Sequence, residues 1–180
     1  MTKKYELVLE DTISFFGWKL FRIKALISFG SVDKGDLGGY ILKEENLSHE
    51  GNAWVSGDAK VWGDAKVWGN AEVSGDAKVW GNAEVWDNAE VWGNAKVSDN
   101  AEVSGDAKVS ELGDIIVFKN HWSSGRHFTY TKSNKMWKVG CFYGTGQELV
   151  EKAYRDSEKS GNYYKAYVDF VETLERLGEE

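Results

Sequence analysis

The longest regular pattern in the chain is a six-residue alternation of apolar and polar positions that runs without a slip from Gly51 to Ser110. In each of its ten hexads, Gly or Asp comes first, Asn or Asp second, Ala third and Val fifth. The fourth residue is charged, except for Trp54, and the sixth is Trp or Ser. Successive side chains of an extended chain point to opposite faces, so Ala and Val share one face. The pattern predicts short strands with an Ala and Val core, separated by Gly–Asx turns.

A period of six with an aliphatic and a small residue is typical of a parallel β-helix. An amphipathic helix fits neither this period nor a Gly in nearly every hexad. Three flat faces need three hexads for each coil, so the ten hexads make just over three coils. The flanking segments 39–50 and 113–118 continue the pattern, with Leu47 expected in the Ala column. We therefore expect about four coils over residues 39–118.

The two ends of the chain lack the repeat. Residues 1–38 are expected to form an N-terminal β cap, with strands at 5–9 and 19–29, because an open solenoid end needs covering. Residues 119–180 are expected to form a small α+β module, either a second cap or a functional head. It begins with a hairpin of strands 127–132 and 136–142. A capping box at Thr145–Glu148 then starts a helix to about residue 158, and a second helix spans roughly 161–177. The apolar residues expected on the inner sides of these two helices are Leu149, Val150, Ala153 and Tyr154, then Tyr163, Ala166, Tyr167, Phe170, Val171, Leu174 and Leu177.

Residues three hexads apart in sequence are expected to stack on one face of the solenoid. This register predicts two Trp-over-Trp ladders, an all-lysine column beside the first ladder, and an amide column of the kind that stabilises stacked parallel strands. The ladders are Trp62 with Trp80 and Trp68 with Trp86; the lysines are Lys60, Lys78 and Lys96; the amides are Asn52, Asn70 and Asn88.

The outward Trp residues have two interpretations. Stacked indoles can simply stabilise the solenoid. Alternatively, with Trp92 included, five Trp side chains of about 150–250 Å² each exceed the apolar patch of about 300–600 Å² usual on a monomer. Part of that area would then meet another surface, either in a side-by-side homotrimer or with a separate partner.

Composition limits the classes of partner and the compartment. The net charge of −7 argues against a nucleic-acid or membrane-surface binder, and it permits a DNA mimic or a basic protein partner. The single cysteine, Cys141, cannot form an internal disulfide, and neither a signal peptide nor a long apolar run is evident. A cytoplasmic protein without a membrane segment is the expectation.

Catalytic motifs are scarce. His49 is expected to be a polar residue on the first coil, and His121 and His127 lie in a loop, HWSSGRHF, whose Arg126 and serines could bind an anion. We expect no catalytic residue, no metal ligand set and no cofactor, because no metal cluster, P-loop or dinucleotide fingerprint is present.

The stretch GDLGGYILKEENLSHEGNAWV (35–55), followed by the repeats, resembles a family of hexapeptide-repeat proteins common in phages and prophages. The tail GCFYGTGQELVEKAY (140–154) is similar to a module that ends many of them. The resemblance implies a mostly β fold built on a left-handed parallel β-helix, and a phage-related origin. Some members are labelled acyltransferases; those that catalyse use a His base and a loop that leaves the coils, and the ten hexads here contain neither.

Our leading hypothesis is a non-catalytic, trimer-prone binding protein with a counter-defence role in the host cytoplasm. It would block a host immune protein, with the four ladder Trp residues as anchors. Alternatively, it would sequester a small nucleotide signal, with Lys60, Lys78, Lys96 and Arg126 on the phosphates and an aromatic ring on the base. Two alternatives remain open: an acyl-CoA-dependent acyltransferase that uses His121 or His127, and a purely structural module.

Overall fold

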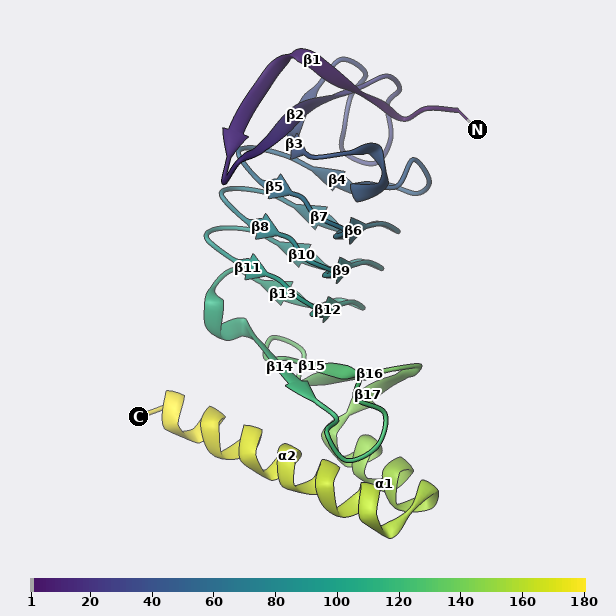
Figure 1. Ribbon diagram of the computed structural model, residues 1–180, viewed down its shortest axis with the longest axis vertical. Helices are drawn as coiled ribbons and strands as arrows, with labels where there is room; N and C mark the ends of the chain where they lie inside the picture. Colours follow the sequence, from purple (N-terminus) through teal and green to yellow (C-terminus); the bar gives the residue numbers. More distant parts are fainter. Residues whose placement is uncertain (1) are drawn as a thin grey trace.

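The computed structural model describes residues 2–180 and has three parts stacked along its long axis (Figure 1). At the top, β1 (Tyr5–Phe15) and β2 (Trp18–Ala25) form an antiparallel hairpin. A parallel β-solenoid of about four coils follows. At the bottom lie a four-stranded antiparallel sheet and two helices. The expected mostly β architecture with a β cap and an α+β module is therefore confirmed.

Each hexad contributes one short strand, and strands that are three hexads apart pair in parallel. The first face joins β3 (Leu37–Ile41) to β5, β8 and β11; the second contains β4, β7, β10 and β13; the third contains β6, β9 and β12. The expected coil of three hexads is confirmed. The strands are β4 (Trp54–Val55), β5 (Lys60–Val61), β6 (Lys66–Val67), β7 (Glu72–Val73), β8 (Lys78–Val79), β9 (Glu84–Val85), β10 (Glu90–Val91), β11 (Lys96–Val97), β12 (Glu102–Val103) and β13 (Lys108–Val109).

The Ala and Val columns fill the solenoid, and all twenty of these residues are buried. The first residue of the hexad adopts a left-handed conformation, with φ of +69° at Gly81 and of +57° and +59° at Asp87 and Asp99. A Cβ at Gly81 would lie only 2.9 Å from the backbone N of Asp99, so stacking as well as φ favours glycine. The predicted amide column is confirmed for two of its three members. Asn70 donates a hydrogen bond to Asn88, and Asn88 donates one to Asp106, which is the last residue of the column.

The first coil is slightly longer than the others. Tyr40 pairs with Lys60 and Leu47 bridges to Val67, and each of these pairs is separated by two more positions in sequence than Lys60 and Lys78 are. The two extra residues lie between Leu47 and Val55, which are eight positions apart where their partners Val67 and Val73 are six apart. The 3₁₀ turn η1 (Glu44–Asn46) precedes this insertion. Leu47 consequently lies in the Val column, and its expected place in the Ala column is wrong.

Three side chains close the upper end by donating hydrogen bonds to backbone carbonyls of the top coil. They replace the backbone N–H groups that a further coil would supply. The bonds run from Lys4 Nζ to Ala53 O (2.7 Å), from Asn46 Nδ2 to Ala65 O (2.8 Å) and from Tyr5 OH to Leu47 O (2.7 Å).

Lys4 is the most unusual member of this closure because it is only 1 % exposed. Its Nζ lies 4.7 Å from the ring centroid of Phe29. Burial disfavours the charged amine and lowers the pKa of Lys4 to about 8. The neighbouring Trp54, which the hexad pattern places outward, is also buried, against Phe29 and Tyr5.

The lower end is closed by the C-terminal module. Residues 113–118 do not form a further hexad: after the turn η2 (Leu112–Asp114), β14 (Ile115–Lys119) pairs antiparallel with β15 (His127–Thr131). The sheet continues through β16 (Met136–Val139) to β17 (Phe142–Thr145), so the expected hairpin is confirmed and two further strands flank it. Ile115 and Val117 pack on the solenoid core while Ile116 and Phe118 pack on the module core, so β14 joins the two.

Two helices, α1 (Gly146–Asp156) and α2 (Glu158–Gly178), cover the other side of this sheet (Figure 1). The predicted capping box is present, with Glu148 N donating to Thr145 Oγ1. Leu149 and Ala153 are buried as expected, but Tyr154 is 41 % exposed and packs on Gly161. On α2 the predicted stripe is confirmed in part: Val171 is buried and Tyr167 packs on the module core as expected. Ala166, Phe170 and Leu177 are exposed instead, and Tyr164 and Val168, which were not expected there, are buried.

Candidate binding site on the lysine face

The outward side of β3, β5, β8 and β11, here called the lysine face, carries the predicted lysine column. Lys60 pairs with Lys78 and Lys78 with Lys96, with Tyr40 above them. The predicted first Trp ladder lies on the same face. The indoles of Trp62 and Trp80 stack with centroids 5.1 Å apart and planes within 5°.

Trp62 is not a free surface residue. The β1–β2 hairpin folds down over the lysine face, and the ring of Phe15 meets Trp62 edge-on at 5.1 Å. With Leu20 and Tyr40, Trp62 forms a small core of its own and is only 7 % exposed. Of the five Trp residues expected to point outward, the first is therefore covered by this hairpin and is not free to meet a partner.

A cavity of about 420 Å³ begins where the hairpin ends. Trp62 and Trp80 line it together with Lys78, Lys96 and Phe16. Phe16 is 84 % exposed at the tip of the β1–β2 turn, with φ of +47°. Sequence reasoning did not assign Phe16 to a site; the only signal is an aromatic residue before Gly17 in a tight turn.

Lys60 is separated from this cavity by its own contacts. Its Nζ donates to the backbone carbonyl of Asp58 (2.8 Å) and lies 5.3 Å from the ring centroid of Phe15. Lys78 makes a longer bond of the same kind, 3.3 Å, to Asp76 O. The structure thus brings two of the three predicted lysines, Lys78 and Lys96, to the cavity.

The second Trp ladder, on β6, β9 and β12, meets the C-terminal module at its lower end. Trp68 and Trp86 stack with centroids 4.9 Å apart and planes within 3°. Lys138 Nζ lies 5.7 Å from the ring centroid of Trp86. Below them Ser104 is buried, and its carbonyl accepts a bond from the hydroxyl of Tyr143. Burial raises the pKa of Glu102 on this face, although the positive charge of Lys138 acts in the opposite direction.

Three other predicted residues are dispersed. Trp92 is 36 % exposed on the second face, where its column otherwise holds Ser. Arg126 is exposed in the loop before β15, where the serines bond within the loop: Ser123 to Asn120 Oδ1, and Ser124 Oγ to the N–H of Arg126. His127 lines a second cavity of about 510 Å³, below β11, which shares Lys96 with the first cavity.

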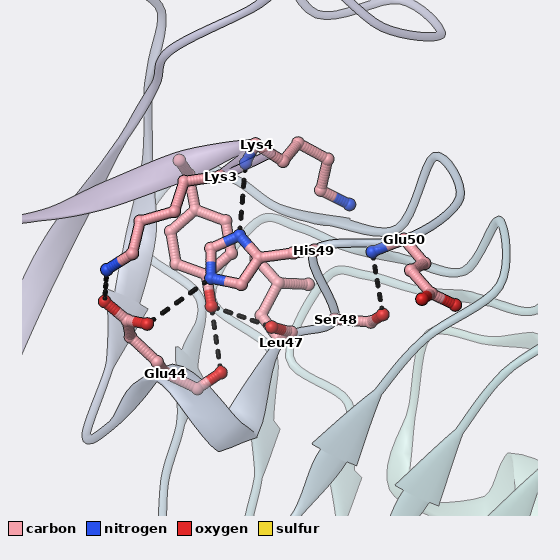
Figure 2. Close-up of polar contacts among 8 residues, drawn as sticks. Lys3, Lys4, Glu44, Leu47, Ser48, His49 and Glu50 are labelled. Carbon is pink, nitrogen blue, oxygen red and sulfur yellow. Dashed lines mark hydrogen bonds and ion pairs between the residues drawn. The ribbon is translucent and has the colours of Figure 1, made fainter. Parts of the chain in front are cut away.

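His49 belongs to the N-terminal closure (Figure 2). Its ring stacks on Tyr5 at 4.2 Å, and Nδ1 accepts a hydrogen bond from the N–H of Lys4 (3.2 Å). Nε2 lies 3.5 Å from Glu44 Oε2, a long contact, while Lys3 Nζ bonds the other oxygen of that carboxylate at 2.7 Å. Lys3 and this contact lower the pKa of Glu44. His121 lies far along the chain from these residues, edge-on to Tyr163 and Trp122.

Comparison with known proteins adds no assignment: no family model matches the chain, and no curated protein matches it. Among residues 2–180, no three His, Cys, Asp or Glu side chains are grouped so that they could hold a metal ion. Neither α1 nor α2 combines the length and apolar character needed to cross a membrane. The geometry of the site is an indole surface, with the amines of Lys78 and Lys96 beside it.

Proposed function

We propose that this protein is a binding protein that sequesters a small anionic ligand with an aromatic ring, of the nucleotide class, on the lysine face. The observation that carries the proposal is that Trp80, Lys78 and Lys96 line one cavity. An indole surface stacks on a nucleobase, and ammonium groups bond phosphate oxygens, so the cavity offers one partner for each half of a nucleotide.

The position of the base follows from the ladder. One side of the Trp80 indole is stacked on Trp62, and the next residue of the column is Ser98, which carries no ring. A ring bound below Trp80 would continue the stack at the spacing already present between the two indoles. Lys96 of β11, two positions before Ser98, would then contact the phosphate.

The second ladder provides an internal comparison. It also ends in a serine, Ser104, but Lys138 and Tyr143 of the C-terminal module occupy that end. The first ladder ends beside a cavity instead. Of the two ladders, the one with Trp80 is the one that can accept a ligand ring.

A counter-defence role accounts for a binding protein of this kind. The resemblance of residues 35–55 and 140–154 to phage hexapeptide-repeat proteins supports it, and the bound ligand would be a nucleotide signal of the host. In a side-by-side trimer, a neighbouring subunit would close the open side of the cavity. Light scattering during gel filtration would measure the mass in solution and decide between monomer and trimer.

The decisive experiment is isothermal titration calorimetry with defined nucleotides: AMP, ADP-ribose and cyclic mono- and dinucleotides. We expect heat with at least one of them. Because stacking on one aromatic residue contributes about 1–3 kcal/mol, Trp80→Ser should weaken binding by roughly fivefold to a hundredfold. Lys78→Ala should also weaken it.

Trp92→Ser is the matched control, because it removes an exposed indole from a different face. It should leave the affinity unchanged. No heat with any nucleotide, or equal losses in Trp80→Ser and Trp92→Ser, would refute the proposal.

A further inference from the structure

We propose that the lower edge of β11 binds an extended peptide as an added strand, with an acidic residue beneath Lys96. In each coil the backbone N–H groups of the fourth and sixth hexad residues donate to the coil below: Lys78 N to Ala95 O (2.9 Å) and Trp80 N to Val97 O (3.0 Å). By the same geometry, the N–H groups of Lys96 and Ser98 point to the lower edge of β11. Neither has a hydrogen-bond partner within residues 2–180, and β11 is the last strand of its sheet.

The other two faces of the solenoid carry acceptor side chains at this level. On the third face, Thr129 accepts a hydrogen bond from a backbone N–H of β12. On the second face, Ser133 and Asp114 accept hydrogen bonds from two backbone N–H groups in and just after β13. The bonds run from Glu102 N to Thr129 Oγ1 (3.0 Å), from Lys108 N to Ser133 Oγ (2.8 Å) and from Ser110 N to Asp114 Oδ2 (2.7 Å). Within residues 2–180, the edge of β11 is therefore the one of the three on which neither of these two donors is taken.

Space for an added strand lies directly below this edge. The cavity of about 510 Å³ extends from Lys96 and Ser98 to Leu112, Ile115 and Val117. It exists because the chain leaves the hexad path after Ser110, so that β14 pairs with β15 instead of with β11. Leu112, at its rim, is 71 % exposed. An apolar wall opposite a strand edge suits a peptide whose alternate side chains point inward.

The pattern of polar groups on the edge selects a peptide rather than a simple anion. The C=O of Lys96 points to the same side as its N–H and stands between the two donors. A carbonyl oxygen there repels an anion that bridges both N–H groups, whereas a neighbouring strand supplies acceptors for the donors and a donor for the carbonyl.

Charge selects an acidic residue at one position of that peptide. The outward residue that stacks on Lys96 continues the column of Lys60, Lys78 and Lys96, and like charges directly opposite one another are unfavourable. Asp99 is also in the lining, so the preference applies to the residue beneath Lys96 rather than to the whole peptide. The predicted motif alternates an outward Glu or Asp with an inward Val or Ile.

The test uses a fluorescein-labelled peptide, Thr-Glu-Val-Glu-Val-Thr, and fluorescence anisotropy with the full-length protein. We expect saturable binding. Loss of one backbone bond or of the charge match corresponds to about 1–1.5 kcal/mol, so two changes should each weaken binding by about tenfold. They are N-methylation of the backbone amide that faces β11, and replacement of both Glu by Lys. Absence of binding by the parent peptide, or equal binding of the N-methylated peptide, overturns the proposal.

The matching protein variant is Ser98→Pro, which removes one free N–H, no backbone hydrogen bond of the solenoid, and one exposed side-chain bond of 3.3 Å from Ser98 Oγ to Asp99 Oδ2. It should weaken binding by about tenfold, and Lys96→Glu should reverse the preference between the Glu and Lys peptides. If Ser98→Pro does not fold, Lys96→Glu and the methylated peptide still decide the question. Hydrogen exchange adds a direct reading: the Lys96 and Ser98 amides should gain protection only with peptide bound. Trp80→Ser should retain peptide binding, so this result is separate from the nucleotide test.

Discussion

Raising the pH into the mildly alkaline range should stabilise this protein, because the folded chain holds Lys4 at a lower pKa than the unfolded chain does. Burial lowers that pKa from 10.5 to about 8. Between these values the unfolded chain binds more protons than the folded chain, so the free energy of unfolding rises with pH. The shift corresponds to about 3 kcal/mol when complete, of which about 2 kcal/mol is gained between roughly pH 7 and pH 9.5.

Urea unfolding followed by circular dichroism at several pH values below 10 measures this gain before tyrosines ionise. Lys4→Met removes the amine and should abolish the rise. Lys3→Met is the control: Lys3 is exposed and pairs with Glu44, so its loss should leave the pH dependence intact. A flat profile for the wild type, or the same rise in Lys4→Met, would show that the buried amine is not responsible.

Other substitutions test the closure, the hairpin and the turns. Burial raises the pKa of Tyr5, so its contribution to stability is complete below about pH 10 and lost above it. Tyr5→Phe should lower the free energy of unfolding by about 1–3 kcal/mol at pH 8. Above about pH 10 the stability of this variant should fall less steeply than that of the wild type, and denaturant unfolding of both proteins at pH 8 and above pH 10 measures the difference. Trp62→Ser should cost about 3–5 kcal/mol and Trp80→Ser clearly less, because only the first lies under the hairpin. Equal losses in denaturant would contradict that burial. Gly81→Ala should cost at least about 1–2 kcal/mol in thermal melts, whereas Gly178→Ala, where a Cβ meets nothing, should be neutral.

The features that could be predicted from the sequence are those that repeat or depend on near neighbours. The Ala and Val core, the lysine column and the stacked indoles all follow from a fixed period. The capping box at Thr145 follows from a short local spacing to Glu148. In each case the partner lies at a constant offset, so one correct register places every residue.

The features that could not be predicted depend on contacts without a period. Nothing in the hexads indicates that the β1–β2 hairpin covers Trp62 or that Lys138 covers Trp86. These contacts decide which ladder remains available to a ligand. Phe16 was missed for the same reason, because its role comes from where the hairpin tip lies.

The segment 113–118 did carry a signal that it leaves the solenoid. Its fourth and sixth positions are Ile116 and Phe118, where the ten hexads have a charged residue or Trp54 and then Trp or Ser. Both faces of this strand are therefore apolar, as expected for a strand buried on two sides. On α2, two overlapping sets of apolar residues have helical spacing, so the pattern alone could not choose the buried one.

The three-hexad register makes the solenoid an adjustable spacer between the N-terminal cap and the C-terminal module. Removing three consecutive hexads would shorten the distance between cap and module by one strand spacing, about 4.8 Å, without turning one against the other. Removing a single hexad would instead rotate the module by about a third of a turn and move the lysines out of line. Length and orientation are therefore set separately by how many hexads are inserted or lost, which gives repeat-number variation in this chain a direct geometric meaning.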